Sequence, residues 1–199
     1  MGTRVTRRRN AAERALEVRE SAQEIALTRG LAAISLRSLA AHCGVTAPLI
    51  AHYEPSMDAL VANTFLAIAE QEIAEVAAHA QSPSEPVEQL RALLNAIADP
   101  TRDNVGEVWC DAWSLGRTNE PLAKAARESM DSWHALATSI IRNGQAVGQF
   151  RDARPEQAAL VLFALVDATA AYQLVSYRSR HERESLVRET LEDILNVSL

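Results

Sequence analysis

Apolar residues recur along this chain at intervals of three and four positions, which is the spacing of one face of an α-helix. Segment 11–28 shows this spacing, and similar apolar stripes follow it to the C-terminus. No segment alternates apolar and polar residues as a half-buried strand does, whereas Ala, Leu, Glu and Arg are abundant. The pattern predicts an all-α protein.

Proline, glycine and small polar residues interrupt the apolar pattern at helix-sized intervals, so we expect about nine helices. Their expected ranges are about 11–28, 36–43, 47–53, 57–80, 87–98, 102–116 and 120–147, then one that begins near 155 and a last one over 183–197. Short helices come first and long helices follow. We therefore expect an N-terminal domain over residues 1–55 and a larger helical body over residues 56–199.

The composition is that of a globular protein with a core of its own. The chain has 199 residues, of which 48% are hydrophobic, and it can bury a core without metal or disulfide support. Cys43 and Cys110 lie too far apart for a metal-ligand motif or a disulfide framework, which favours a reducing compartment. The polar, arginine-rich start does not resemble a signal peptide. We expect a cytoplasmic protein.

One apolar run, residues 158–175, is long enough to be weighed as a membrane span. Asp167 lies at its middle, where inserting a charge costs about 2.5–3.5 kcal/mol, and alanines offset little of that cost. A helix buried on all sides within protein, as at a subunit interface, accounts for the run better. We therefore expect no membrane partner.

Charge is distributed unevenly along the chain. The net charge is −6, yet residues 1–60 carry eight arginines against six acidic residues and are net +2, which leaves −8 for the remainder. A basic end attracts phosphate and an acidic body is repelled by it, so this distribution favours a nucleic-acid contact near the N-terminus. The arginines within residues 4–9 form a basic arm that could take part.

Residues 35–53 carry the pattern of a helix-turn-helix. Two helices of about two turns each flank Gly44, which permits the positive φ of a sharp turn. We expect Ser35 and Thr46 to cap the two helices, and Pro48 is tolerated in the first turn of the second. A shared core is expected from Leu39, Val45 and Ile50, and Ala40 is small where the two helices must approach closely.

This segment and its surroundings resemble the TetR family of repressors. The matching positions are Ala26, Gly30, Ile34, Ser35, Leu39, Ala40, Gly44, Val45, Thr46, Ile50, His52, Tyr53, Ser56, Asp58 and Leu60. The form around Gly44 and the later Gly148-x-Phe150-Arg151 turn look closest to the betaine-repressor branch. The resemblance implies a second helix that enters the DNA major groove, and a body that binds an inducer and forms a dimer.

The resemblance and the side-chain chemistry together nominate DNA-contacting residues. Arg37 suits a bidentate contact with guanine, which is worth about 1–3 kcal/mol of discrimination. Hydroxyl and ring donors suit phosphates, and small apolar side chains suit thymine methyl groups. The predicted set is Ser35, Arg37, Thr46, Ala47, Pro48, Leu49, His52 and Tyr53. Alternatively, Ser35 and Thr46 are caps only, Tyr53 packs inward and Arg37 is a solvated charge.

Three positions depart from the family pattern. Ala51 stands where the recognition helix usually has its first aromatic residue, and Met57 stands where a lysine usually contacts phosphate. Glu54 replaces a phenylalanine and would repel phosphate unless its side chain points away from DNA. We therefore expect DNA affinity to depend on Arg37 and on the basic arm.

The body carries aromatic and polar residues at spacings that suit a small-molecule pocket. Trp109 and Trp113 share one helix face, and so do Phe163 and Asp167. The predicted ligand-binding set is Trp109, Trp113, Met130, Trp133, His134, Phe163 and Asp167. The alternative interpretation places the tryptophan pair in the core. The inducer itself is not identified by the sequence.

The last two helices favour a homodimer. The eighth is apolar on every side, so a partner subunit is expected to cover its outer face. Residues expected to complete a four-helix seam are Leu186, Val187, Leu191, Ile194 and Leu195. Two heads on a two-fold axis would read a palindrome with half-sites about 34–36 Å apart. We hypothesise that the inducer moves the helix over residues 57–80 and thereby releases DNA.

The sequence thus favours a transcriptional regulator, most simply a repressor that a small molecule releases from palindromic double-stranded operator DNA. Asp131-x-x-His134 and Glu75-x-x-x-His79 are single pairs, and no nucleophile, phosphate-loop or dinucleotide motif accompanies them. We expect no enzymatic activity, no cofactor and no metal. Two alternatives stay open: a helical adaptor without DNA binding, which the three departures above would suit, and a small helical-bundle enzyme.

Overall fold

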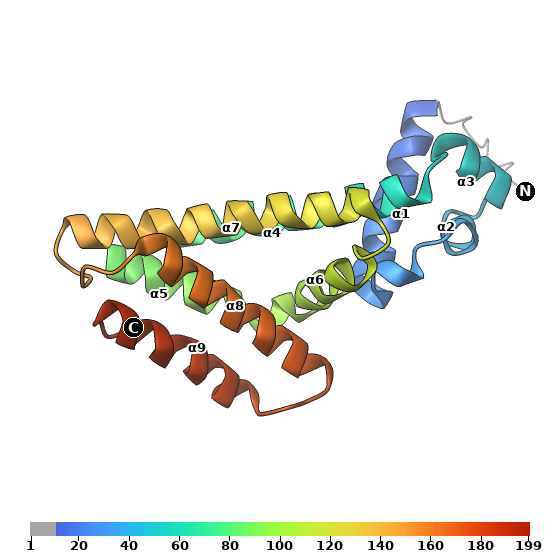
Figure 1. The fold of residues 1–199 in the computed structure, drawn as a ribbon. Coiled ribbons are helices and arrows are strands. Elements are labelled where there is room, and N and C mark those ends of the chain that lie inside the picture. The colour runs from blue at the N-terminus through green and yellow to red at the C-terminus, as the bar shows by residue number, and fades with distance from the viewer. Residues whose placement is uncertain (1–10) are drawn as a thin grey trace, which may run out of the picture.

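A computed structural model describes residues 11–199 of the chain (Figure 1). Its helices are α1 (Ala11–Arg29), α2 (Leu36–Cys43), α3 (Ala47–Tyr53), α4 (Met57–Ala80), α5 (Pro86–Ile97), α6 (Asp103–Leu115), α7 (Glu120–Ala146), α8 (Pro155–Leu174) and α9 (Arg180–Leu195). Two 3-10 turns, η1 (Leu31–Ala33) and η2 (Pro100–Arg102), precede α2 and α6. Over these residues the predicted all-α fold with nine helices is confirmed. The basic arm expected at residues 4–9 lies outside the described part.

Capping residues set the helix boundaries. The Asn119 side chain accepts the N–H of Leu122 and so begins α7 at the predicted place. The last helix differs from the prediction, because it begins at Arg180 rather than at residue 183. Ser179 and Glu182 form a reciprocal capping box there, in which each side chain accepts the backbone N–H of the other residue.

The helices form an elongated molecule with a small head at one end (Figure 1). The head consists of α1, α2 and α3, while α4 and α7 pack side by side along the length of the body. Helices α5, α8 and α9 lie toward the other end. Helix α6 contacts α1 and η1 on the head side and α8 on the body side. The head is therefore joined to the body through α6 as well as through α4.

The turn after α7 fixes the last helix against the body. Gly148 takes a positive φ of 75° and lets the chain reverse, and the ring of Phe150 then lies directly on Gly144 of α7. The backbone N–H of Arg151 donates to the Leu195 carbonyl at 2.8 Å, so the end of α9 is held at this turn. The short segment between α7 and α8 therefore has a packing role.

Apolar side chains remain exposed along α8, the connection that follows it, and α9. They are Leu160, Tyr172, Leu174, Val175, Tyr177 and Leu186. Within one chain α8 is thus not buried on all sides, and only 22% of its most apolar 18-residue window is buried. Among the described helices, α8 alone has the length and hydropathy of a membrane span, a property shared by core helices of soluble proteins. One chain leaves an apolar flank uncovered here.

The predicted intersubunit seam on α9 needs correction. Val187, Leu191 and Leu195 are buried in the core of their own chain, with exposures of 9%, 1% and 0%. They are therefore not available to a partner subunit, whereas Leu186 is exposed and Ile194 is half-buried. A helical repeat shows that a stripe is buried but not which molecule buries it.

Candidate functional site

The predicted helix-turn-helix is present in the head. Gly44 ends α2 in the left-handed conformation, with φ 65° and ψ 35°, so the chain turns at this residue. Ser35 caps α2 and forms a capping box with Ser38. Leu39 and Ile50 are fully buried between the helices, so the short helices share the core that the sequence indicated.

The prediction that the Thr46 hydroxyl caps α3 is wrong. Thr46 occupies the N-cap position with an extended backbone, but its side chain makes no capping hydrogen bond. Pro48 lies in the first turn, where it removes no helical hydrogen bond. An uncapped helix start leaves backbone N–H groups and the Thr46 hydroxyl directed to the surroundings of the head.

The eight residues predicted to contact DNA lie together on α2, on α3 and at their N-caps. Ser35, Arg37, Thr46, Pro48 and His52 are exposed, and Ala47, Leu49 and Tyr53 are half-buried. The His52 and Tyr53 rings contact each other edge to face, with centroids 5.2 Å apart. Glu54, the residue expected to repel phosphate, is buried. The structure thus places five of the eight at exposed positions and three at half-buried ones on these two short helices and their N-caps, while Glu54 is buried.

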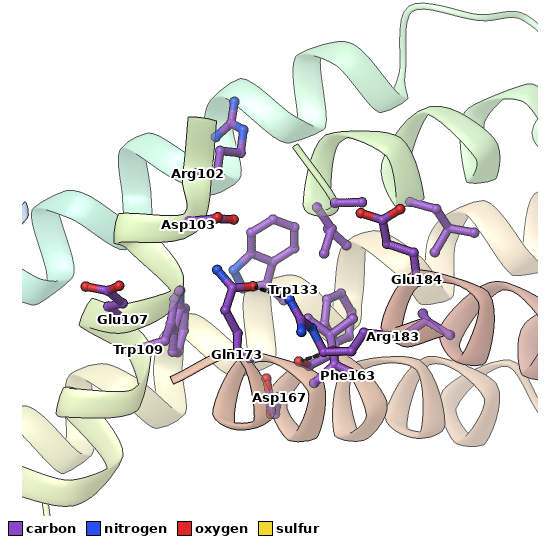
Figure 2. A pocket seen from close by; sticks show the side chains of 18 of the residues that line it. Arg102, Asp103, Glu107, Trp109, Trp133, Phe163, Asp167, Gln173, Arg183 and Glu184 are labelled. Carbon is purple, nitrogen blue, oxygen red and sulfur yellow. Dashed lines mark hydrogen bonds between the residues drawn. The ribbon is translucent and has the colours of Figure 1, made fainter. Parts of the chain in front are cut away.

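The seven residues predicted to bind a ligand also lie together. Trp109 and Trp113 of α6, Met130, Trp133 and His134 of α7, and Phe163 and Asp167 of α8 line one pocket (Figure 2). The core interpretation of the tryptophan pair is also correct in part, because Trp109 is buried and Trp113 is half-buried against the core while both line the pocket. Residues of α4, α5 and α9 also line the pocket.

Aromatic rings form one part of the pocket wall, and charged side chains from α6, α8 and α9 form another. Trp109 and Trp113 lie with centroids 6.0 Å apart, and Trp133 and Phe163 with centroids 5.6 Å apart. Phe65 of α4 packs edge to face against Trp109 at 4.9 Å and holds that ring in place. Rings from three helices therefore face one space, as Figure 2 shows for Trp109, Trp133 and Phe163.

Two carboxyl groups stand among these rings. Burial raises the pKa of Asp167 from 3.8 to about 6. Burial also raises the pKa of Glu72, although a hydrogen bond from Trp109 Nε1 at 2.9 Å and the charge of Arg102 counteract part of this effect. Desolvated carboxylates beside aromatic faces form an environment that a cation would stabilise.

Trp113 has a donor with no partner. Its indole Nε1 is buried, and no acceptor in the described residues is within hydrogen-bond distance. A buried N–H that makes no hydrogen bond is costly, so this group would gain from an acceptor supplied by a bound molecule. The pocket wall therefore contains anionic groups, and one of its side chains, Trp113, has a buried donor that makes no hydrogen bond within the described residues.

Arginines lie where the pocket meets α9. Arg180 pairs with Asp103 at 2.5 Å, and Arg183 donates to Gln173 Oε1 at 3.2 Å (Figure 2). Salt bridges and hydrogen bonds thus join the start of α6, the end of α8 and the start of α9 beside the pocket.

Sequence reasoning missed Glu72, Gln173 and Arg183. Glu72 had a signal, because it continues the buried stripe of Phe65, Ile68 and Ala69 on α4 at helical spacing. An acid on an apolar stripe indicates a functional or paired carboxylate. Gln173 and Arg183 had no such signal, since the fold alone brings their helices together.

Metal binding receives no support from the described side chains. Within residues 11–199, no three His, Cys, Asp or Glu residues gather closely enough to hold an ion. His79 Nδ1 lies 2.8 Å from the Glu75 backbone carbonyl, so this pair of the sequence is a local contact within α4.

Comparisons with known proteins agree with this architecture. Residues 86–196 match the family model described as BetI-type transcriptional repressor, C-terminal, a TetR-family domain. No curated protein matches the chain significantly.

Solved structures share the whole fold. A transcriptional regulator from Saccharomonospora viridis in complex with choline has a TM-score of 0.83 at 20% identity, with 92% of this chain and 98% of that chain covered. A TetR-family regulator from Rhodococcus sp. has a TM-score of 0.75 at 16% identity, covering 92% and 99%. A regulator from Pseudomonas aeruginosa PAO1 has a TM-score of 0.74 at 22% identity, covering 94% and 91%.

Proposed function

Since the chain belongs to the TetR family of transcriptional regulators and has a BetI-type repressor domain, we propose that it is a dimeric repressor. We further propose that it binds a palindromic operator and that an organic cation releases it from this DNA. A ligand-responsive DNA-binding repressor is the function that the family and the fold support. The proposal adds the DNA-contacting surface, the dimer surface and the ligand class. It assigns residues 1–55 to DNA binding and 56–199 to ligand binding and dimerisation, in the cytoplasm. It includes no catalytic activity.

The proposed DNA contact is the surface of α2 and α3. Arg37 is exposed and has room to reach a base edge, while the free hydroxyl of Thr46 and the N–H groups at the start of α3 suit a phosphate. His52 and Tyr53 lie one turn further along the same helix. The withdrawal of Glu54 from this surface supports the proposal, because no carboxylate at that position would face phosphate.

The proposed dimer surface is the exposed apolar flank of α8 and α9. Leu160 on α8 and Leu186 on α9 are 55% and 45% exposed, and Leu160 belongs to the apolar helix α8, which one chain leaves partly uncovered. Apolar side chains gathered on one face mark an interaction surface, and a second copy of the chain on a two-fold axis would cover it. Such a dimer places two heads on the two halves of a palindrome.

The proposed ligand is a small quaternary ammonium compound. One observation carries this assignment: the rings of Trp109, Trp113, Trp133 and Phe163 line a space that the half-buried carboxyls of Asp167 and Glu72 also line. Aromatic faces attract cations whose charge is spread over methyl groups, and each such contact contributes about 0.5–2 kcal/mol. The choline held by the Saccharomonospora viridis regulator belongs to this class, which supports the proposal.

The unpartnered donor of Trp113 narrows the class further. An oxygen on the ligand, such as the hydroxyl of choline, would accept the Nε1–H that finds no acceptor in the pocket. The proposed ligand thus carries a cationic head and a nearby oxygen acceptor.

The test combines DNA selection with ligand binding. We expect the purified protein to enrich a palindrome from a random DNA pool, and choline to quench tryptophan fluorescence and weaken operator binding. The matched control ligand is the neutral tert-butyl analogue of choline, in which carbon replaces nitrogen. Equal binding of both molecules would overturn the cation assignment. A lack of enriched DNA at low salt would overturn the repressor assignment.

A further inference from the structure

Helix α6 carries pocket residues and a head-contacting residue on different sides of one short helix. Trp109 and Trp113 line the pocket, whereas Asp111, which lies between them in sequence, turns toward the head. Asp111 Oδ2 accepts the backbone N–H of Leu31 at 2.7 Å, although 80 positions separate the two residues. One helix turn thus connects the ligand space to the DNA-binding domain.

The contact between Asp111 and the head lies beside a glycine. Gly30 has φ +83°, and a Cβ at this position would lie 2.5 Å from Asp111 Oδ2. A side chain at position 30 would therefore displace the Asp111 carboxylate, and the positive φ of Gly30 itself favours glycine. Gly30 ends the run of α1 and precedes η1, so Asp111 holds the point where the chain leaves α1 for the helix-turn-helix.

Leu31 transmits this contact into the head. Its side chain is 1% exposed, and it starts η1, which leads through Ile34 to the capped start of α2 at Ser35. The first N–H groups of a helical turn have no partner within the turn, so a carboxylate that accepts one of them orients the whole segment. The direction of α2 and α3 is thereby linked to Asp111.

The other side of α6 is joined to the pocket and to α4. On this side Trp109 donates to Glu72 of α4 at 2.9 Å. Asn104, near the start of α6, adds a second contact with the head, because it donates to the Leu27 carbonyl of α1 at 3.5 Å. A molecule bound beside Trp109 and Trp113 would contact α6 directly, and a short helix in a packed core would respond to that contact as a unit.

We propose that Asp111 is the positioning residue through which α6 sets the orientation of the head and passes pocket occupancy to the DNA-reading helices. The ligand-dependent part rests on the proposed function, whereas the orienting part needs no ligand. In a dimer, the orientation of each head fixes the distance between the two recognition helices. Without the Asp111 carboxylate, each head would take a range of orientations, and the distance between the two recognition helices would no longer be fixed.

The orienting part is tested with operators of two spacings. The variants are Asp111→Ala, Asp111→Asn, which keeps an acceptor oxygen, and the control Asp131→Ala, which removes the same charge from the exposed face of α7. One base pair inserted between half-sites should weaken binding of the wild type and of Asp131→Ala by roughly tenfold or more, because spacing is set geometrically. The loss of affinity caused by the inserted base pair should fall to roughly threefold or less for Asp111→Ala, and for Asp111→Asn it should lie between the losses of the wild type and of Asp111→Ala.

A second measurement needs neither DNA nor ligand. Spin labels at position 41 on the exposed face of α2, with Cys43 and Cys110 replaced by alanine, report the distance between the two heads of a dimer. We expect a narrow distribution for the parent and for Asp131→Ala, and a broad one for Asp111→Ala or, if that variant does not fold, for Asp111→Asn. Unchanged distributions together with an unchanged spacing penalty would overturn the proposal.

Measurements with choline distinguish the proposed ligand class from the proposed role of Asp111. In Asp111→Ala, choline should still quench tryptophan fluorescence, yet the ratio of operator affinities without and with choline should fall toward one. A variant that binds choline and releases DNA as the wild type does would overturn the transmitting role. If choline fails to bind the wild type, the proposed ligand class fails, while the spacing and distance measurements still decide the role of Asp111.

Discussion

Arg19 Nε donates to Glu54 Oε1 at 2.9 Å, so the end of α3 is tied back to α1 across 35 positions of sequence. The Glu54 side chain is only 10% exposed, whereas that of Arg19 is 58% exposed. The carboxylate that the sequence placed beside DNA is therefore turned into the head and neutralised there. A departure from the family pattern acts here as an internal brace.

The brace can be tested with Glu54→Gln. We expect a loss of less than about 1 kcal/mol in unfolding free energy, because the exposed Arg19 is screened by solvent, which corresponds to about 2–4 °C or less in Tm. Thermal unfolding of both single variants and of Arg19→Gln/Glu54→Gln completes a double-mutant cycle. Additive effects would contradict a direct interaction.

Arg37 is predicted to carry base recognition. Arg37→Ala should weaken operator binding by about 1–3 kcal/mol, or roughly five- to 150-fold, and relax the preference at one base pair of each half-site. The control is Arg29→Ala, which removes the same charge from the exposed end of α1. Fluorescence anisotropy with the operator and with singly substituted operators measures both effects. Equal losses in the two variants would indicate only a general charge effect.

Asp167 predicts a pH-dependent ligand affinity. Its pKa of about 6 means that the carboxyl is mostly protonated at pH 5 and mostly ionised at pH 7.5. Choline affinity should therefore rise with pH by up to about tenfold over this range, since one pKa unit corresponds to a factor of ten. Fluorescence titrations at several pH values measure the change, and Asp167→Asn should bind weakly with a flat profile.

The same pKa shift affects folding with the opposite sign. The folded chain holds the Asp167 proton more tightly than the unfolded chain, so this residue lowers stability as pH rises from about 4 through 6. Asp167→Asn should consequently raise the Tm at pH 7.5 and leave it nearly unchanged at pH 4. A lower Tm at pH 7.5 would show that the carboxylate is stabilised in the folded state.

Trp113 predicts a difference between two ligands. Trp113→Phe keeps an aromatic face but removes the unpartnered N–H, so choline should bind about threefold to tenfold more weakly, the usual net contribution of one hydrogen bond. Tetramethylammonium has no oxygen and should lose much less affinity. Calorimetric titration of both ligands on both proteins gives the comparison. A similar loss for the two ligands would place the effect in the ring and not in the donor.

Leu160 tests the dimer surface. Leu160→Glu places a carboxylate on the exposed flank of α8, and burying it without a partner costs at least about 2 kcal/mol in each subunit. We expect monomers in sedimentation velocity at concentrations where the wild type is dimeric. Val147→Glu is the control, because Val147 is 62% exposed and lies at the end of α7. Dimers in both variants would require a different interface.

Local signals made most of the fold predictable. Caps, prolines and Gly44 mark helix ends through interactions of a few residues, so the ranges of α1 to α8 agree with the predictions within a few positions. The start of α9 differs from the prediction because the Ser179–Glu182 capping box that begins this helix lies in a stretch rich in charge, where no apolar stripe marks the helix start. The prediction of a Thr46 cap was wrong for another reason, because the hydroxyl of a residue at the N-cap position need not rotate toward the helix.

The sequence predicted only those pocket residues that share one face of a single helix. Trp109 with Trp113 and Phe163 with Asp167 are pairs on one helix face, and the fold turned both pairs into the same pocket. Glu72 joins them through a hydrogen bond between α4 and α6, which no single-helix pattern contains. Buried stripes likewise do not show whether the chain itself or a partner covers them, so Val187 and its neighbours on α9 were assigned to the wrong side.

The two flanks of α8 have a consequence for how this repressor responds in a cell. Phe163 and Asp167 face the pocket, while Leu160 on the same helix faces outward to the proposed partner. In the proposed dimer, a wall only one helix thick would separate the ligand from the partner subunit, so ligand binding and subunit association would each shift the other. The inducer concentration at which transcription begins would then depend on how many copies of the repressor the cell contains, and a change in expression level alone would retune the response.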